Sequence, residues 1–298
     1  MKQKQAVHTG RQSLFPVLLL AVLVLVFSSA HAEETGKLKP YDEENGYTYI
    51  TFGKYPQTID GGSPDDSKNT WAWKKMYRDW EVATRKELKL KVHDPINPYD
   101  PGPIDPDPIL WRILSADDNQ FYVMSEYVLF ASPVHPSMTE YRETGSDFGQ
   151  TQICAKLNGE FADTAFSDAE KDAMLPIASY GKVSLPSADD LNNPAMGFSK
   201  KKLATRKAMA TEYAIRSTGA FVYQVSVGCH SPYWLREQAE SDKRQARSTK
   251  QTGSVGRLHC DAADVGARPV ICLSADRIRI TGGNGTKEDP YQLSAIEE

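Results

Sequence analysis

The chain has 298 residues, of which 40% are hydrophobic, 25% charged and 10% aromatic, the proportions of a globular protein. This composition argues against a wholly disordered or fibrous chain, and a mean hydropathy of −0.50 with a single long apolar stretch excludes a polytopic membrane protein. The formal charge of −4 argues against nucleic-acid binding, which needs a basic face to replace the counterions on phosphates.

Residues 1–32 have the three-part pattern of a secretory signal peptide. Its parts are a basic start (Lys2, Lys4, Arg11), an apolar run (Leu14–Phe27) and small residues before the cleavage point (Ala30, Ala32). The apolar run is shorter than the roughly 20 residues that a membrane span requires. We therefore expect cleavage after Ala32, which moves the formal charge from −4 to −7, and a periplasmic or secreted protein without a stable membrane span.

All four cysteines follow the expected cleavage point: Cys154, Cys229, Cys260 and Cys272. An even number of cysteines in an exported chain predicts two disulfides, because compartments beyond the cytoplasmic membrane are oxidising. Four cysteines allow three pairings, and the sequence pattern does not choose among them.

The first third of the expected mature chain mixes one strand with irregular segments. Residues 33–46 are charged and predict a flexible leader, and Tyr47–Phe52 alternates at period two, as a strand does. An aromatic cluster follows at Trp71, Trp73, Tyr77 and Trp80. Asp94–Pro108 contains six prolines, which lack the amide hydrogen that helices and sheets use, so it predicts an extended loop.

The middle of the chain predicts helices after a hairpin formed by Ile109–Leu114 and Gln120–Ser125. Apolar spacing and capping residues locate four helices: Gln152–Phe161, one that begins at Ser167 with a capping box to Glu170, a brief one capped by Ser187–Asp190, and Lys200–Arg216.

The residue pattern in the last third of the chain predicts strands at Phe221–Val227, Tyr233–Leu235, Gly253–Leu258 and Pro269–Leu273. It also predicts a polar loop at Arg236–Gln251 and a closing hairpin of Ile278–Ile280 with Tyr291–Leu293. Helices in the middle and strands at both ends indicate an α+β domain in which the first and last strands meet. We expect one domain over residues 47–298, with an Asp/Pro-rich insertion at about 60–108.

Several phrases of the chain resemble a bacterial family of exported proteins known only as a domain of unknown function. They are Ile50–Gln57, Ile109–Leu114, Met124–Leu129, Cys154–Leu157, Phe161–Lys171, Tyr233–Arg236 and Ala267–Leu273. The family resembles the C-type-lectin-like fold, which also houses the formylglycine-generating oxidases and variable ligand-binding proteins. Two features depart from its pattern: Glu237 and Gln238 begin a long polar segment, and the Trp71 region is an insertion.

The resemblance implies a C-type-lectin-like α+β fold with mixed, mostly antiparallel sheets and two to four helices in the middle of the chain. It also implies a pairing of the cysteines, because lectin-like domains bridge their first helix to the last strand and a middle strand to the loop before it. Carried over, Cys154 pairs with Cys272 and Cys229 pairs with Cys260.

One cluster has the side chains for metal chemistry, formed by Cys229-His230 and His259-Cys260. Neighbours in a strand point to opposite faces, so one Cys-His pair does not easily give both ligands to one ion, and an oxidising compartment favours a disulfide. The oxidases of this fold hold copper with two late thiols, but Cys260 and Cys272 are further apart than that pattern. We therefore assign neither a metal nor a cofactor.

No protease, hydrolase or phosphate-loop motif occurs, so no catalytic residue is assigned. Trp234 and Arg268 are expected in the core, whereas Tyr233, Arg236, His259 and Asp261 are the candidate ligand-binding residues beside the late loops. The sequence thus favours a non-enzymatic recognition module for an extracytoplasmic glycan, peptide or protein. The alternatives are a copper oxidase of the same fold and a structural envelope protein.

Overall fold

A computed structural model of the protein describes residues 35–58, 86, 106–117, 119–199, 201, 203–223, 230–250 and 252–297. The chain divides into two compact units, Met1–Lys37 and Leu38–Glu298, and every strand and helix named below belongs to the second. The expected signal peptide, the Trp71–Trp80 aromatic cluster, most of the Asp/Pro-rich loop and Cys229 lie outside the described residues. Within the described ranges, no helix is both long and apolar enough to cross a membrane.

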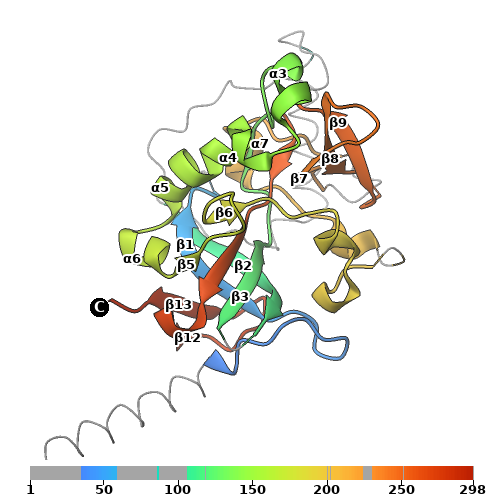
Figure 1. The fold of residues 1–298 in the computed structure, drawn as a ribbon. Helices are drawn as coiled ribbons and strands as arrows, with labels where there is room; N and C mark the ends of the chain where they lie inside the picture. Colours follow the sequence, from blue (N-terminus) through green and yellow to red (C-terminus); the bar gives the residue numbers. More distant parts are fainter. Residues whose placement is uncertain are drawn as a thin grey trace, which may run out of the picture. The chain divides into compact units, whose positions relative to one another are not determined.

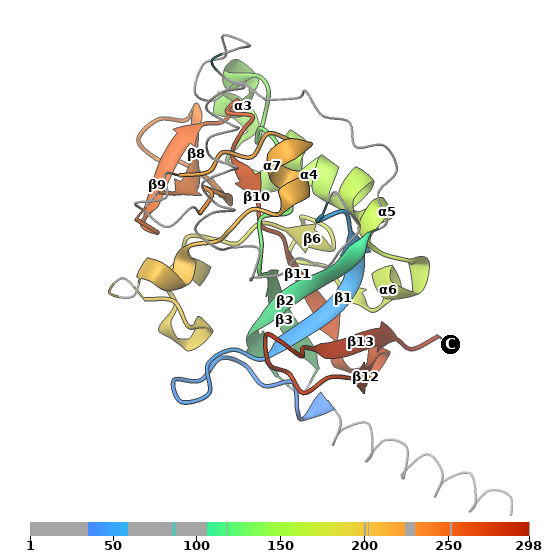
Figure 2. The ribbon, with the colours of Figure 1, turned by 180° about the vertical axis from the view of Figure 1, so that it is seen from behind.

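The fold is α+β and is built on one large, mostly antiparallel sheet (Figure 1). In spatial order its strands are β12 (Ile278–Gly282), β13 (Tyr291–Ala295), β1 (Tyr49–Tyr55), β2 (Asp107–Ala116), β3 (Gln120–Ser125), β11 (Val270–Ser274) and β5 (Met174–Leu175), and β6 (Val183–Ser184) also pairs with β11. The β1–β13 pair is parallel, with Ile50 opposite Tyr291. The expectation that the first and last strands meet is confirmed, as Figure 2 shows from behind.

The predicted hairpin of β2 and β3 is confirmed, and local chemistry explains its turn. The Asp117 carboxylate accepts hydrogen bonds from the backbone N–H groups of Asn119 and Gln120, at 2.9 and 3.0 Å. An aspartate that bonds to the backbone two and three residues ahead mimics a backbone turn and reverses the chain. The closing hairpin of β12 and β13 is confirmed as well.

The centre of the core lies where helices cover β1 and β2. Trp111 is fully buried, its Nε1–H donates to the carbonyl of Phe52 at 2.8 Å, and its ring stacks on Phe166 with centroids 6.4 Å apart. The helix predicted over Gln152–Phe161 is present as α4 (Gln152–Lys156) followed by a π-helical turn at Leu157–Phe161 and by α5 (Ala162–Ala165). Aromatic burial on this scale dominates the stability of a core.

Short helices complete the fold: α3 (Met138–Thr144), α6 (Asp168–Asp172) and α7 (Glu212–Arg216), with 3-10 turns that include Asp190–Asn192 and Leu203–Arg206. The predicted capping box at the start of α6 is confirmed, because the Ser167 hydroxyl accepts from the Glu170 N–H and the Glu170 carboxylate accepts from the Ser167 N–H. The brief helical turn after Ser187 is also confirmed, since the Asp190 N–H donates to the Ser187 hydroxyl at 2.8 Å.

The single helix predicted over Lys200–Arg216 is wrong. The described part of this segment has a 3-10 turn, an extended stretch and then α7. In the extended stretch Ala208 forms a bridge with Ser231 and Ala210 forms one with Val128, so tertiary backbone pairing outweighs the local helix propensity. Thr211 then caps α7 by accepting a hydrogen bond from the Ala214 N–H.

Three further predictions need correction. Phe221–Tyr223, the described part of one predicted strand, has no strand structure. Arg236–Gln251, predicted as a loop, instead contains the end of one strand and the whole of another. Leu38, in the segment expected to be a flexible leader, is buried in the core, so the packed unit starts before Tyr47.

The structure also departs from the implied pairing of Cys154 with Cys272. Both carry buried free thiols with separate partners, the carbonyl of Tyr180 at 3.3 Å from Cys154 Sγ and the Gln120 side-chain oxygen at 3.2 Å from Cys272 Sγ. Cys260 is likewise a buried free thiol. Burial disfavours the charged thiolate and, with help from Asp261 and Asp117, raises the pKa of Cys260 to about 12 and that of Cys272 to about 11.

Candidate functional site

A second, three-stranded sheet lies apart from the large one and contains a polar hollow. Its antiparallel strands are β7 (Trp234–Gln238), β8 (Gln245–Thr249) and β9 (Val255–His259), in that spatial order (Figure 1). Burial alternates along β8, where Ala246 and Ser248 are buried and Gln245 and Arg247 are half-exposed. One face of the sheet therefore packs on the protein and the other meets solvent.

Buried aromatic residues at the start of β7 anchor this sheet to the rest of the unit. The Nε1–H of Trp234 donates to the carbonyl of Ser132 at 2.8 Å, and the Tyr233 hydroxyl donates to the carbonyl of Arg206 at 2.6 Å. Both side chains are fully buried, as expected for Trp234 and contrary to the surface role expected for Tyr233. A sheet fixed in this way presents its exposed face with little freedom, which favours binding.

The two connections of the sheet are tight turns with identifiable causes. In the β7–β8 turn, the Asp242 carboxylate accepts two hydrogen bonds from the Arg244 guanidinium, each 3.0 Å long, and this contact lowers the pKa of Asp242 to about 2. In the β8–β9 turn, Gly253 has φ of +83°, and a Cβ there would come within 2.2 Å of the Leu203 carbonyl. Only glycine tolerates both conditions, so Gly253 fixes how β9 returns along β8.

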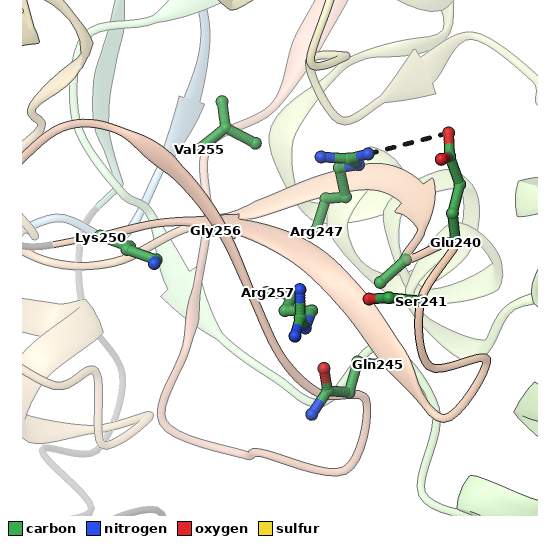
Figure 3. Close-up of a pocket in the computed structure, with 9 residues that line it drawn as sticks. Glu240, Ser241, Gln245, Arg247, Lys250, Val255, Gly256 and Arg257 are labelled. Carbon is green, nitrogen blue, oxygen red and sulfur yellow. Dashed lines mark ion pairs between the residues drawn. The ribbon is translucent and has the colours of Figure 1, made fainter.

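The exposed side of this sheet forms a hollow of about 530 Å³, the size of an ordinary small-molecule site (Figure 3). Its lining consists of Ala239, Glu240, Ser241, Gln245, Arg247, Lys250, Val255, Gly256 and Arg257. We call these nine residues the basic hollow, because three of the side chains are cationic and one is a carboxylate. No aromatic residue belongs to the lining, so a ring stacked on a protein aromatic is not the binding mode that it favours.

The cations of the basic hollow come from neighbouring strands. Arg247 on β8 lies directly opposite Arg257 on β9, and Gln245 lies opposite His259 in the same register. The nearest anionic group to Arg247 is the Glu240 carboxylate, 3.9 Å away and 92% exposed, and Figure 3 marks this pair with a dashed line. An exposed pair of this kind contributes little binding energy, so Arg247 remains available to a ligand.

Lys250 also lines the hollow, and its stem lies beside a glycine. A Cβ at position 256 would come within 2.3 Å of Lys250 Cε and 2.7 Å of its Cγ, so the lysine stem lies against the bare backbone of Gly256. Any side chain at this position would force the flexible lysine to move. Gly256 thus provides the room in which the third cation rests.

The four residues that the sequence offers as ligand-binding candidates lie in different environments in the structure. Tyr233 is in the core, and Arg236 is half-buried, donates to the carbonyl of Leu185 at 3.3 Å and pairs with Asp190 at 3.8 Å. His259 and Asp261 are exposed, and only His259 has a register partner, Gln245, in the basic hollow. Arg236 therefore acts within the fold, whereas His259 lies at the edge of the hollow.

The residues that carry the charge of the hollow are not among the candidates from the sequence. Arg247 and Lys250 lie in Arg236–Gln251, which the sequence predicts as a loop, and Arg257 lies in the predicted strand Gly253–Leu258. The sequence Gln245-Ala-Arg-Ser-Thr249 does alternate polar and small residues, which is the pattern of a half-buried strand. This alternation predicts that Gln245 and Arg247 lie on the same face of a strand. The pairing of Arg247 with Arg257 depends on the register, which the sequence does not show.

The Cys-His cluster does not assemble in the described part of the chain. His259 is exposed and its neighbour Cys260 is buried, so the two side chains of this pair point in different directions. His230 is buried beside Tyr223, with ring centroids 5.2 Å apart, and Cys229 lies outside the described residues. Among the described residues, no three His, Cys, Asp or Glu side chains gather in a way that could hold a metal ion.

Comparison with protein-family models, with curated proteins and with solved structures found no match to this chain. The geometry of the site therefore carries the functional argument.

Proposed function

We propose that the protein is a non-enzymatic recognition module that works beyond the cytoplasmic membrane, and that the basic hollow on β7, β8 and β9 is its ligand-binding site. The observation that carries this proposal is a hollow of about 530 Å³ with charged and polar lining, on a sheet anchored by the buried Trp234. A pre-formed concave site with a few polar groups is the usual form of a small-ligand site.

The location of the hollow supports the C-type-lectin-like assignment that forms part of this proposal. The hollow lies on the late segment after Arg236, where the resemblance implies variable ligand contacts, and the α+β architecture with mostly antiparallel sheets is compatible with it. Because one fold hosts many functions, the fold alone does not identify the ligand. Export rests on the signal-peptide pattern of residues 1–32.

The copper-oxidase alternative receives less support from the residues that it would use. Cys260 and Cys272 would have to bind metal as thiolates, but burial raises the pKa of both thiols, and Cys272 is hydrogen-bonded to Gln120. The basic hollow contains neither cysteine. Recognition therefore accounts for the arrangement of side chains better than oxidation does.

A glycan and peptide array tests the proposal when the protein is compared with a variant whose hollow is filled. Ser241→Trp places an indole in the lining, and Ser179→Trp is the matched control because Ser179 is exposed and outside the hollow. We expect a defined set of array signals that Ser241→Trp abolishes and Ser179→Trp keeps. Silence across the array, or signals that survive Ser241→Trp, would overturn the assignment.

A further inference from the structure

We propose that the basic hollow binds a small ligand through a carboxylate, sulfate or phosphate group held by Arg247 and Arg257, with Lys250 as the third cation. This inference rests on the proposed function, since it takes the hollow to be the ligand site, and adds the chemical class of the ligand. It follows from the placement of the cations, from the absence of an ion pair on Arg257 and Lys250 within the described structure, and from the polar groups around them.

Two arginines of the hollow face each other across neighbouring strands. Arg247 and Arg257 are direct register partners on β8 and β9. Like charges placed opposite each other in an antiparallel sheet repel and destabilise it. An anion between the two guanidinium groups would reverse that effect, because each can donate paired hydrogen bonds to a carboxylate, sulfate or phosphate.

The cations of this segment differ in how closely a carboxylate of the protein pairs with them. Arg244 and Arg236, outside the hollow, have close carboxylates: Asp242 at 3.0 Å and Asp190 at 3.8 Å. Inside the hollow, neither Arg257 nor Lys250 forms a side-chain hydrogen bond or ion pair with any described residue. Among the described residues, Arg257 and Lys250 therefore have no internal partner, and Arg247 has only the exposed Glu240 carboxylate at 3.9 Å.

The charge of the whole chain and the polar lining limit the size and character of the ligand. The whole chain is acidic, with a formal charge of −4, so a long polyanion would meet repulsion beyond the three cations. The side-chain oxygen of Gln245 is buried without a hydrogen-bond partner in the described structure and can accept from a ligand hydroxyl. These features favour a small acid that also carries hydroxyl groups.

Isothermal titration calorimetry of the purified protein tests this class with citrate, glucuronate, inorganic phosphate and sulfate, and with glucose as the neutral probe. We expect at least one of the four anions to bind, and glucose not to. Citrate and glucuronate combine carboxylate with hydroxyl groups, whereas phosphate and sulfate have no carbon-bound hydroxyl. Comparing the affinities of the four anions therefore shows which anionic group the hollow binds. Binding should weaken as salt is raised, because salt screens exposed charges.

Matched variants make the test specific to the hollow. Arg257→Ala should weaken binding of the anion by about tenfold or more, since it removes a charge-assisted hydrogen bond. Arg279→Ala, a change to an exposed arginine on β12 of the large sheet and outside the hollow, should leave binding unchanged. Glu240→Gln should strengthen binding severalfold, because it removes the carboxylate that competes for Arg247. A merely structural role for these residues would not give effects of opposite sign.

The outcomes also separate this inference from the proposed function. If the array signals depend on the hollow but belong to neutral ligands, and Arg257→Ala binds them as the Arg279→Ala control does, the recognition function is supported and the anion inference is overturned. If anions bind equally well to Arg257→Ala and to the unmodified protein, the inference is also overturned. If neither the array nor the anions give binding, both proposals fail.

Discussion

At the scale of single residues, the most consequential buried charge is Glu126. Its carboxylate accepts hydrogen bonds from the Arg112 guanidinium, lies 3.7 Å from Arg268 Nη2 and lies 3.2 Å from Lys287 Nζ. Arg268 is fully buried and its Nε–H also donates to the carbonyl of Ser125 at 2.7 Å. One anion therefore compensates cations from β2, from the segment before β11 and from the β12–β13 hairpin.

Replacing that anion tests the arrangement. Glu126→Gln leaves two buried guanidinium groups without a carboxylate, and we expect it to lower the free energy of unfolding by about 3–5 kcal/mol at neutral pH. Urea denaturation followed by tryptophan fluorescence measures the loss. A change no larger than that of an exposed Glu→Gln variant, for which Glu43→Gln serves, would contradict the argument.

The same residue gives a pH dependence with a defined sign. Burial alone would raise the pKa of Glu126, but Arg112, Arg268 and Lys287 together outweigh it and hold the pKa below its ordinary value. The stabilisation is then complete above the unfolded pKa of about 4.3 and is lost as the pH falls through the lower folded value. The unfolding free energies of the unmodified protein and of Glu126→Gln should therefore converge on acidification. If the two unfolding free energies changed in parallel with pH, the Glu126 carboxylate would not be the stabilising group.

The cysteines give a third test at this scale. With raised pKa values, the buried Cys154, Cys260 and Cys272 should not react with an aromatic disulfide reagent in the native protein at about pH 8, and all three should react in denaturant without reductant. Peptide mapping identifies each labelled thiol. Residues that react only after reduction would instead be bridged, as the resemblance implies.

At the scale of elements, the reliable predictions from sequence are those whose cause is local. The Asp117 turn, the Ser167 capping box and the alternation in β1 each depend on a few neighbouring residues, and each is present in the structure. The failures depend on contacts distant in sequence. Ala208 and Ala210 have good helix propensity, yet they pair with Ser231 and Val128 in extended backbone.

The candidate site was predictable in part for the same reason. The sequence places the candidate contacts on the late segment and predicts a strand at Gly253–Leu258, where β9 lies. It predicts neither β8 nor the register that sets Arg247 opposite Arg257. Tyr233 is a surface candidate in the sequence because it borders the late loops, whereas in the structure its hydroxyl donates to a buried backbone partner, the carbonyl of Arg206.

The start of α7 allows a test of local capping. Thr211 Oγ1 accepts a hydrogen bond from the Ala214 N–H at 3.1 Å, so Thr211→Ala should lower the free energy of unfolding by about 1 kcal/mol. Thr211→Ser keeps the acceptor and controls for the lost methyl group. Chemical denaturation compares the two variants, and an equal loss of stability in both would show that the cap contributes nothing.

At the scale of the whole second unit, the closing hairpin protects the first strand. β13 covers the edge of β1 by parallel pairing, and Leu293 of β13 is buried in the core. Without this strand, β1 would expose unpaired N–H and C=O groups, which are a template for aggregation. The parallel contact between the two ends of the unit thus both completes the sheet and limits its edges.

Leu293 and Ile296 form a matched pair for this idea, being 8% and 37% exposed in the same terminal segment. Leu293→Ala should destabilise the unit by about 2 kcal/mol or more, because it leaves a cavity behind β13. Ile296→Ala should change stability by less than about 0.5 kcal/mol. Thermal unfolding measures the stability of both variants. Similar losses of stability would mean that burial of the hairpin does not stabilise the unit.

The central claim is that the β7–β8–β9 sheet is the recognition surface, and backbone-amide NMR tests it most directly. Titrating the tightest-binding anion of the calorimetric series should shift the resonances of Gln245, Arg247, Lys250, Gly256 and Arg257 together, with a single affinity. Amides of the large sheet, such as those of β2 and β3, should stay in place. Shifts that gather away from the three-stranded sheet, or none at saturating anion, would contradict the account.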